Sequence, residues 1–177
     1  MTGVFQFYIF LKVHTLKDMA KTEHERFMRM AIRVSEGNVK NGLGGPFGAV
    51  VVRSGKLVAK SANKVTTTLD PTAHAEVSAI RMACRKLKTF DLTGCVIYTS
   101  CEPCPMCLSA IYWAHIDKIY YANTKSDAHL IGFDDQFIYD EIALPMNKRK
   151  LGIQQILRDE AQVAFRLWDE SDMKSMY

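Results

Sequence analysis

Two short stretches of the chain carry residue types that bind metal ions and move protons: residues 72–76 (TAHAE) and residues 103–107 (PCPMC). Two cysteines separated by two residues can hold one metal ion together, and His74 offers a third ligand. A structural zinc ion is usually closed by four protein ligands, whereas a catalytic zinc ion keeps one position open for water. The set His74, Cys104 and Cys107 therefore predicts a catalytic Zn²⁺ site.

Glu76 follows His74 by only two residues. On a regular helix these side chains would point about 200° apart, so they can converge only where a helix begins. We therefore expect both motifs to open helices, where backbone N–H groups and the helix dipole favour the thiolate that zinc requires. Glu76 is then expected to be the catalytic proton carrier beside the metal rather than one of its ligands.

The cysteines allow two other interpretations. Cys104 and Cys107 could form a redox pair, which would leave His74 and Glu76 without a role, or Cys101 could close a structural zinc site. The chain has five cysteines. Three of them fall within seven positions, which is a poor disulfide framework and favours a reducing compartment such as the cytoplasm.

Strand and helix patterns alternate around the motifs. Strands are predicted at residues 47–53, 56–62, 96–99, 118–122 and 152–157, and helices from Thr22, at 72–87 and 105–114, within 127–141 and at 159–168. The first two strands form a hairpin across Ser54-Gly55. The order predicts an α/β fold, a three-layer α/β/α sandwich with one mixed sheet of about five strands.

Length and composition are those of one folded domain. The 177 residues are 48% hydrophobic and 24% charged, with a formal net charge of +4. This mild charge gives little support to a nucleic-acid partner, and no apolar run reaches the roughly 18 residues that span a membrane. We place the domain at residues 19–177. Residues 1–18 are expected to be an N-terminal extension, either disordered or an extra strand.

The paired motifs match H-x-E followed by P-C-x-x-C, which marks the zinc nucleobase deaminases. From about Glu23 to Tyr177 the chain resembles the cytidine-deaminase-like superfamily, and within it the bacterial guanine deaminases. Matching stretches are 44–50 (GGPFGAV), 70–77 (DPTAHAEV), 99–107 (TSCEPCPMC) and 132–139 (GFDDQFIY). The tRNA adenosine deaminases are similar over the His and Cys motifs, but Cys101 stands where Leu is expected in them.

The resemblance implies hydrolytic deamination of guanine to xanthine and ammonia, with Zn²⁺ as cofactor. It implies that Asn63 binds the base, that Phe47 packs near the base plane and that Tyr177 helps close the site. It also implies that Asp135 binds the base and helps move protons, which suits guanine because a carboxylate only accepts and guanine presents two N–H donors on one edge. A homodimer that exchanges its C-terminal segment is expected as well.

Other functions and roles stay open at this point. The substrate could be guanosine or another purine nucleoside, or an adenosine in tRNA, and the fold could be a zinc-stabilised module without catalysis. Asp135 could instead cap a helix, Phe47 could be a core residue, and Tyr177 could be a frayed terminus.

Overall fold

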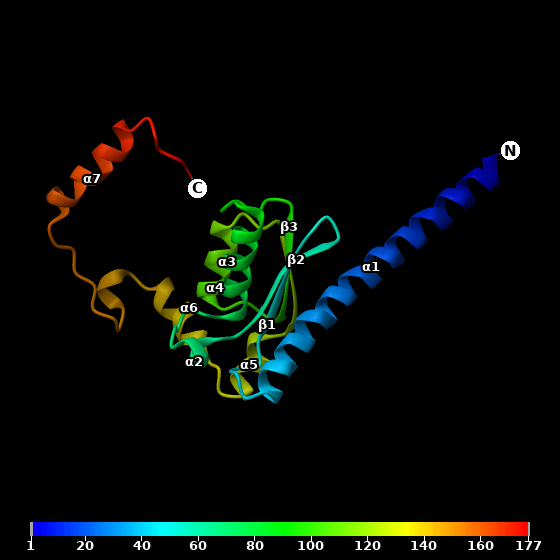
Figure 1. The fold of residues 1–177 in the computed structure, drawn as a ribbon, viewed down its shortest axis with the longest axis horizontal. Helices are drawn as coiled ribbons and strands as arrows, with labels where there is room; N and C mark the ends of the chain where they lie inside the picture. Colours follow the sequence, from blue (N-terminus) through cyan, green and yellow to red (C-terminus); the bar gives the residue numbers. More distant parts are fainter. Residues whose placement is uncertain (1, 177) are drawn as a thin grey trace. The chain divides into compact units, whose positions relative to one another are not determined.

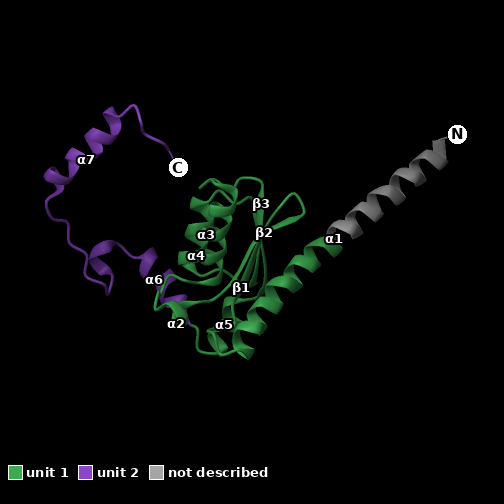
Figure 2. Cartoon of the chain, viewed as in Figure 1, with its two compact units in different colours: residues 1–133 green, residues 134–177 purple. Residues whose placement is uncertain are grey.

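The fold is described from a computed structural model. Residues 21–176 are described in full, and residues 2–20 only as part of helix α1, Thr2–Lys40. The predicted extension at residues 1–18 therefore lies outside the fully described residues, and its boundary remains a prediction. The chain forms two compact units, residues 1–133 and 134–177 (Figure 2), and each is described by itself.

The first unit contains a mixed four-stranded sheet with the order β2-β1-β3-β4. Its strands are β1 (Gly48–Arg53), β2 (Lys56–Ala62), β3 (Cys95–Cys101) and β4 (Lys118–Asn123). β1 pairs antiparallel with β2 and β3, and β3 pairs parallel with β4. Ser54 and Gly55 both have positive φ, 49° and 71°, as a tight two-residue hairpin turn requires, so the predicted hairpin is confirmed.

Helices cover both faces of this sheet (Figure 1). On one face, Phe27 and Ala31 of α1 pack with Val50 and Val52 of β1 and with Tyr98. Because side chains alternate along a strand, the neighbouring residues of β1 point to the other face. There, Ala49 and Val51 pack with helix α3 (Ala75–Leu87) and with Ile111 of helix α4 (Pro105–Trp113). The predicted three-layer α/β/α sandwich is therefore confirmed.

The remaining helices are short or belong to the second unit. They are α2 (Val65–Thr68), α5 (Lys125–Leu130), α6 (Gln136–Ala143), the 3₁₀ helix η1 (Met146–Lys148) and α7 (Arg158–Glu170). Thr124 and Asp127 form a capping box at the start of α5. Among the described residues, no helix is both long and apolar enough to cross a membrane.

The prediction of a fifth strand at residues 152–157 is wrong, because the described chain is irregular there and the sheet has four strands. The segment carries strand-forming residues, and Ile153 and Ile156 are exposed. A strand needs hydrogen bonds from a neighbouring strand. A local pattern of apolar residues does not reveal whether such a neighbour exists.

Gly48 marks the closest approach of α1 to the sheet. A Cβ atom built at Gly48 would collide with the carbonyl oxygen of Ala31 and would lie 2.8 Å from the backbone nitrogen of Ser35. Both obstacles are backbone atoms of a packed helix, so neither can move aside easily. Gly48 thus sets the spacing between α1 and β1.

We predict that Gly48→Ala lowers the free energy of unfolding by about 1–3 kcal/mol, as overpacking usually does. Gly37→Ala is the matched control, since a Cβ there has nothing within 4 Å and Gly37 lies inside α1. Removing a helical glycine should stabilise the protein by about 0.5–1 kcal/mol. Urea unfolding of both variants measures the difference, and a destabilised Gly37→Ala together with an unaffected Gly48→Ala would contradict this account.

Candidate metal and catalytic site

His74 and Cys104 each occupy the N-cap position of a helix, as the two motifs predict. His74 precedes α3 and Cys104 precedes α4, and both have extended backbone angles, with φ near −60° (−62° and −64°). A turn at Asp70 leads into His74, because the Asp70 carboxylate accepts hydrogen bonds from the Thr72 backbone N–H at 2.8 Å and hydroxyl at 2.7 Å. At the other motif, Pro105 begins α4, where its fixed φ and missing N–H are tolerated.

The ligand atoms of the three candidate residues lie together. His74 Nδ1 is 3.6 Å from Cys104 Sγ and 3.5 Å from Cys107 Sγ, and the three atoms all fall within 4.8 Å of one another. Tetrahedral zinc, with bonds of about 2.1 Å to nitrogen and about 2.3 Å to sulfur, places nitrogen and sulfur about 3.5 Å apart. The donor types and both nitrogen–sulfur spacings therefore fit a zinc ion.

Cys101 does not join this cluster. Its thiol donates to the carbonyl oxygen of Thr124 at 3.5 Å, and the group of possible metal ligands found among the described residues consists of His74, Cys104 and Cys107. Three protein ligands are typical of a catalytic zinc site, in which the fourth position is left for water or substrate. The arrangement therefore disfavours a structural site closed by Cys101.

Glu76 lies beside the ligands as the second residue of α3. Its side chain is buried, and the Cys107 thiol donates to its Oε2 atom at 3.5 Å. Burial raises the pKa of Glu76, because a charged carboxylate is poorly stabilised away from water. His74 is an N-cap residue with extended backbone, so the angle of about 200° between the His74 and Glu76 side chains of a regular helix does not apply. Both side chains reach the Cys107 sulfur.

The two cysteine thiols interact closely, and this interaction moves their pKa values in opposite directions. The hydrogen bond from Cys107 and, after it, the contact with His74 lower the pKa of Cys104 to about 4, against the opposing effect of burial. The same shared hydrogen bond raises the pKa of Cys107. Zinc binds cysteine as the thiolate, so a lowered pKa of Cys104 suits a metal ligand, and binding zinc through both sulfurs would release thiol protons.

Asn63 and Phe47 are connected to the metal ligands through the backbone. Lys64 N–H donates to the carbonyl of Ala73 at 2.9 Å, which ties the residue after Asn63 to the residue before His74. Asn63 N–H in turn donates to the carbonyl of Phe47 at 3.0 Å.

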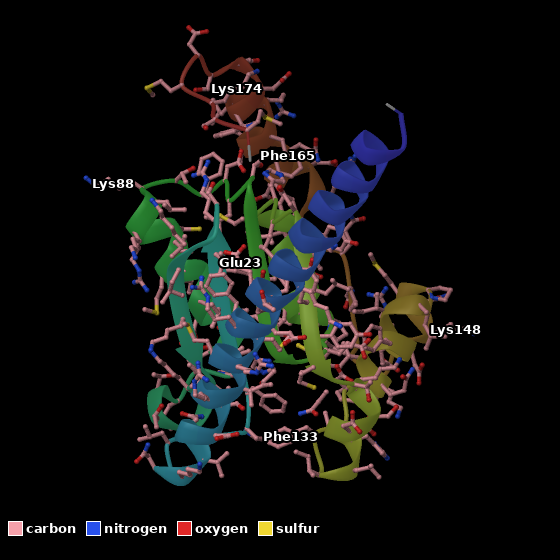
Figure 3. The ribbon with its side chains drawn as sticks, turned by 90° about the vertical axis from the view of Figure 1, so that its right-hand side faces the viewer. Glu23, Lys88, Phe133, Lys148, Phe165 and Lys174 are labelled. Carbon is pink, nitrogen blue, oxygen red and sulfur yellow. The ribbon has the colours of Figure 1, made fainter. Side chains whose placement is uncertain are left out.

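The side chains of these two residues differ in their surroundings. The buried Asn63 accepts at Oδ1 from Val65 N–H at 3.2 Å. Phe47 packs against the core. Its ring also contacts the ring of Phe133 (labelled in Figure 3) edge to face, with the ring centroids 4.9 Å apart. Phe47 is therefore partly a core residue, as its alternative interpretation held.

Asp135 and Tyr177 belong to the second unit of the chain, whereas the three ligands belong to the first. Tyr177 is outside the described residues. Asp135 occupies the N-cap position of α6, but within the described chain its side chain makes no capping hydrogen bond. Asp134 instead accepts from Gln136 N–H at 3.0 Å. The predicted roles of Asp135 and Tyr177 remain predictions.

Sequence reasoning missed one buried polar residue close to Asn63. The amide of Asn38 donates to the carbonyl oxygens of Gly45 and Asn63, both at 2.9 Å. A signal for it exists in the sequence, because Asn38 continues the helical stripe of Phe27 and Ala31 that faces the sheet. A polar residue on such a stripe needs a hydrogen-bond partner.

Comparison with known proteins agrees with this geometry. The cytidine and deoxycytidylate deaminase zinc-binding region matches residues 21–123. A guanine deaminase of Bacillus subtilis is 47% identical over 154 residues, which cover 87% of this chain and 99% of that protein. Its X-ray structure superposes with a TM-score of 0.85, covering 87% of this chain and 98% of the other.

Two more distant relatives cover less of the chain. A structure of a guanine deaminase from Nitrosomonas europaea is 34% identical with a TM-score of 0.59, over 62% of this chain and 63% of that one. A tRNA-specific adenosine deaminase of Aquifex aeolicus is 40% identical over 98 residues, which cover 55% of this chain and 64% of that protein. The similarity to the tRNA enzyme is thus confined to part of both chains.

We predict one zinc ion per chain, held by one nitrogen and two sulfur ligands. Cys104→Ala should lose the metal, because two ligands cannot replace the three that meet here, while Cys101→Ala should keep it. Elemental analysis of both purified variants gives the metal content, and X-ray absorption of the parent gives the ligand types. A parent spectrum with three sulfur ligands would place Cys101 on the metal and overturn the catalytic geometry.

Proposed function

Because the chain belongs to the cytidine and deoxycytidylate deaminase family, we propose that it is a zinc-dependent aminohydrolase that converts guanine to xanthine and ammonia. The observation that carries this proposal is the cluster of His74, Cys104 and Cys107 with a buried glutamate, Glu76, 3.5 Å from one of the sulfurs. The guanine deaminase of Bacillus subtilis, which aligns over 99% of its own length, supports the choice of substrate.

The chain's own residues supply the proton transfers. Zn²⁺ held by His74, Cys104 and Cys107 would lower the pKa of a water molecule from about 15.7 to near 7. Glu76 takes a proton from the attacking water and passes it to N3 of guanine while the new C–O bond forms at C2. The proton of the new C2 hydroxyl is then passed, through Glu76 or Asp135, to the 2-amino group; the C2–N bond breaks as the C2 carbonyl forms, and ammonia leaves. General acid–base catalysis of this kind contributes about 10² to 10⁴ in rate.

Guanine is selected by the groups around its edge. With Oδ1 of Asn63 held by Val65 N–H, the Asn63 amide offers N–H donors to an acceptor on the base. Phe47 offers an aromatic ring for the base plane. Asp135 accepts from N1–H and the 2-amino group and assists the second proton transfer, and Tyr177 closes the site.

The alternatives have weaker support. The tRNA-specific adenosine deaminase of Aquifex aeolicus is 40% identical, against 47% for the guanine deaminase of Bacillus subtilis, and the net charge of +4 is small for a tRNA-binding surface. Purine nucleosides differ from guanine by a sugar on N9, and the substrate panel below separates them. A non-catalytic zinc module would require a fourth protein ligand, and the candidate Cys101 instead donates to the carbonyl of Thr124.

We also propose that two chains form a homodimer that exchanges the C-terminal segment. Helix α7 carries the exposed side chains of Phe165, Leu167 and Trp168, and α4 carries the exposed Tyr112 and Trp113. Exposed apolar residues in such numbers mark interaction surfaces. We further propose that the protein is cytoplasmic, because cysteines that serve as metal ligands stay reduced in a reducing compartment.

Ammonia release from a panel of guanine, guanosine, adenine, cytosine and tRNA tests the function. We predict turnover of guanine by the parent, and a loss of several orders of magnitude in kcat for Glu76→Gln with zinc retained. Gln is nearly isosteric but cannot carry a proton, and Glu76 is not a ligand. No ammonia from guanine would reject the proposed substrate, whereas loss of zinc from Glu76→Gln would make Glu76 part of the metal site.

Asp135→Asn tests the selection of guanine. It replaces an acceptor oxygen with a donor that must face a donor on the base, which should cost about 2–4 kcal/mol. We predict that kcat/KM for guanine falls by roughly 30- to 1,000-fold at 1.36 kcal/mol per decade. The matched control is Asp134→Asn, which keeps the capping of Gln136 because Asn caps as well as Asp. Equal activity of the two variants would remove Asp135 from the site.

A further inference from the structure

Asn38 is a buried amide at the last turn of α1, and its side chain reaches out of the helix. It is 5% exposed. Its Nδ2 atom donates one hydrogen bond to the carbonyl of Gly45 and one to the carbonyl of Asn63, so both N–H groups of the amide are used. The partners lie on different segments, the loop before β1 and the residue after β2. Asn38 therefore joins three parts of the chain that are separate in sequence.

Both carbonyls belong to the segments that present the proposed base-binding residues. Phe47 N–H donates to the same Gly45 carbonyl at 2.8 Å, and Asn63 N–H donates to the Phe47 carbonyl at 3.0 Å. These bonds form a closed path from Asn38 through Gly45 and Phe47 to Asn63 and back. A shift of Asn38 would therefore move both base-binding segments together.

Gly44 shows how closely these segments meet. A Cβ atom built at Gly44, whose φ is +152°, would lie 2.9 Å from the Asn63 carbonyl oxygen and 3.1 Å from Asn38 Nδ2. The backbone of the loop thus lies directly against the amide of Asn38 and the carbonyl that this amide binds. Only a residue without a side chain leaves room for both hydrogen bonds.

We propose that Asn38 is a positioning residue that aims Asn63 and Phe47 at the base, an inference that rests on the proposed function. Val65 N–H holds Oδ1 of Asn63 and Asn38 holds its main-chain carbonyl, so the backbone and the side chain of Asn63 are both anchored. The Asn63 amide N–H groups then point in one direction before any ligand binds. Asn38 acts on the substrate only through Asn63 and Phe47 and does not act on zinc or Glu76.

Asn38→Ala removes both hydrogen bonds: the buried carbonyl of Asn63 loses its donor, while the carbonyl of Gly45 keeps only the one from Phe47 N–H. Misplacing a binding group by about 1 Å can cost as much as 10²-fold. The expected result is a 10- to 100-fold loss in kcat/KM for guanine, mainly as a higher KM. The zinc content and the pH profile of kcat should stay those of the parent, because the ligands and Glu76 are untouched.

Binding without turnover isolates the positioning role. Hypoxanthine lacks the 2-amino group and cannot be deaminated at C2, so calorimetric titration of the zinc-loaded protein measures affinity alone. Asn38→Ala should weaken hypoxanthine binding at least 10-fold. Two control variants should bind like the parent: Asn41→Ala, directly after α1, whose amide donates to the Gly37 carbonyl, and Phe27→Leu within α1, a core change that lowers stability.

A double-mutant cycle decides whether Asn38 acts through Asn63. If it does, Asn38→Ala should weaken hypoxanthine binding much less in an Asn63→Ala background than in the parent, because the group it positions is already gone. Full additivity of the two losses would overturn the proposal, as would an unchanged affinity of Asn38→Ala. If Asn38→Ala does not fold, Asn38→Leu carries the same expectations, since it keeps a similar volume and loses both donors without adding a buried charge.

Measurements on the parent protein distinguish a failure of this inference from a failure of the proposed function. A zinc-loaded parent that neither deaminates guanine nor binds hypoxanthine would reject the proposed function, and this inference with it. A parent that turns over guanine, together with a fully active Asn38→Ala, would reject the role of Asn38 alone.

Discussion

The meeting of two helix N-termini at one point is the constraint on which the rest of this structure depends. His74 and Cys104 are 30 residues apart in sequence, yet Nδ1 and Sγ lie 3.6 Å apart. The two helices that they precede pack on the same face of one sheet, and β1 and β3 are neighbours in that sheet. A change in strand order would separate the ligands even if every local motif remained.

The same arrangement explains how buried polar groups are tolerated near the site. Glu76, Asn38 and Asn63 are all buried, and an unpaired polar group at such a depth would be strongly destabilising. Each has a partner: the Cys107 thiol for Glu76, two carbonyls for Asn38 and the Val65 N–H for Asn63. A satisfied polar network is rigid, which is the property that a site for proton transfer and base recognition requires.

Much of the site could be predicted from the sequence because its signals are local. The spacing of Cys104 and Cys107 is set by one helical turn, and Pro105 marks where that turn begins. His74 and Glu76 could both serve one centre only if a helix started there, and it does. The hairpin followed from Ser54-Gly55 between a β-branched run and an alternating one, since turn residues act over a few positions. Such features need no knowledge of distant parts of the chain.

Only the tertiary structure decided which distant groups meet. Cys101 was an equal candidate for the metal by residue type, but its thiol is directed to Thr124 by the pairing of β3 with β4. Residues 152–157 had the composition of a strand and form none among the described residues, because pairing depends on a neighbouring edge. Asn38 became significant once its two carbonyl partners were known. Residue type and spacing determine what a group can do chemically, whereas packing between remote segments determines which partners it finds.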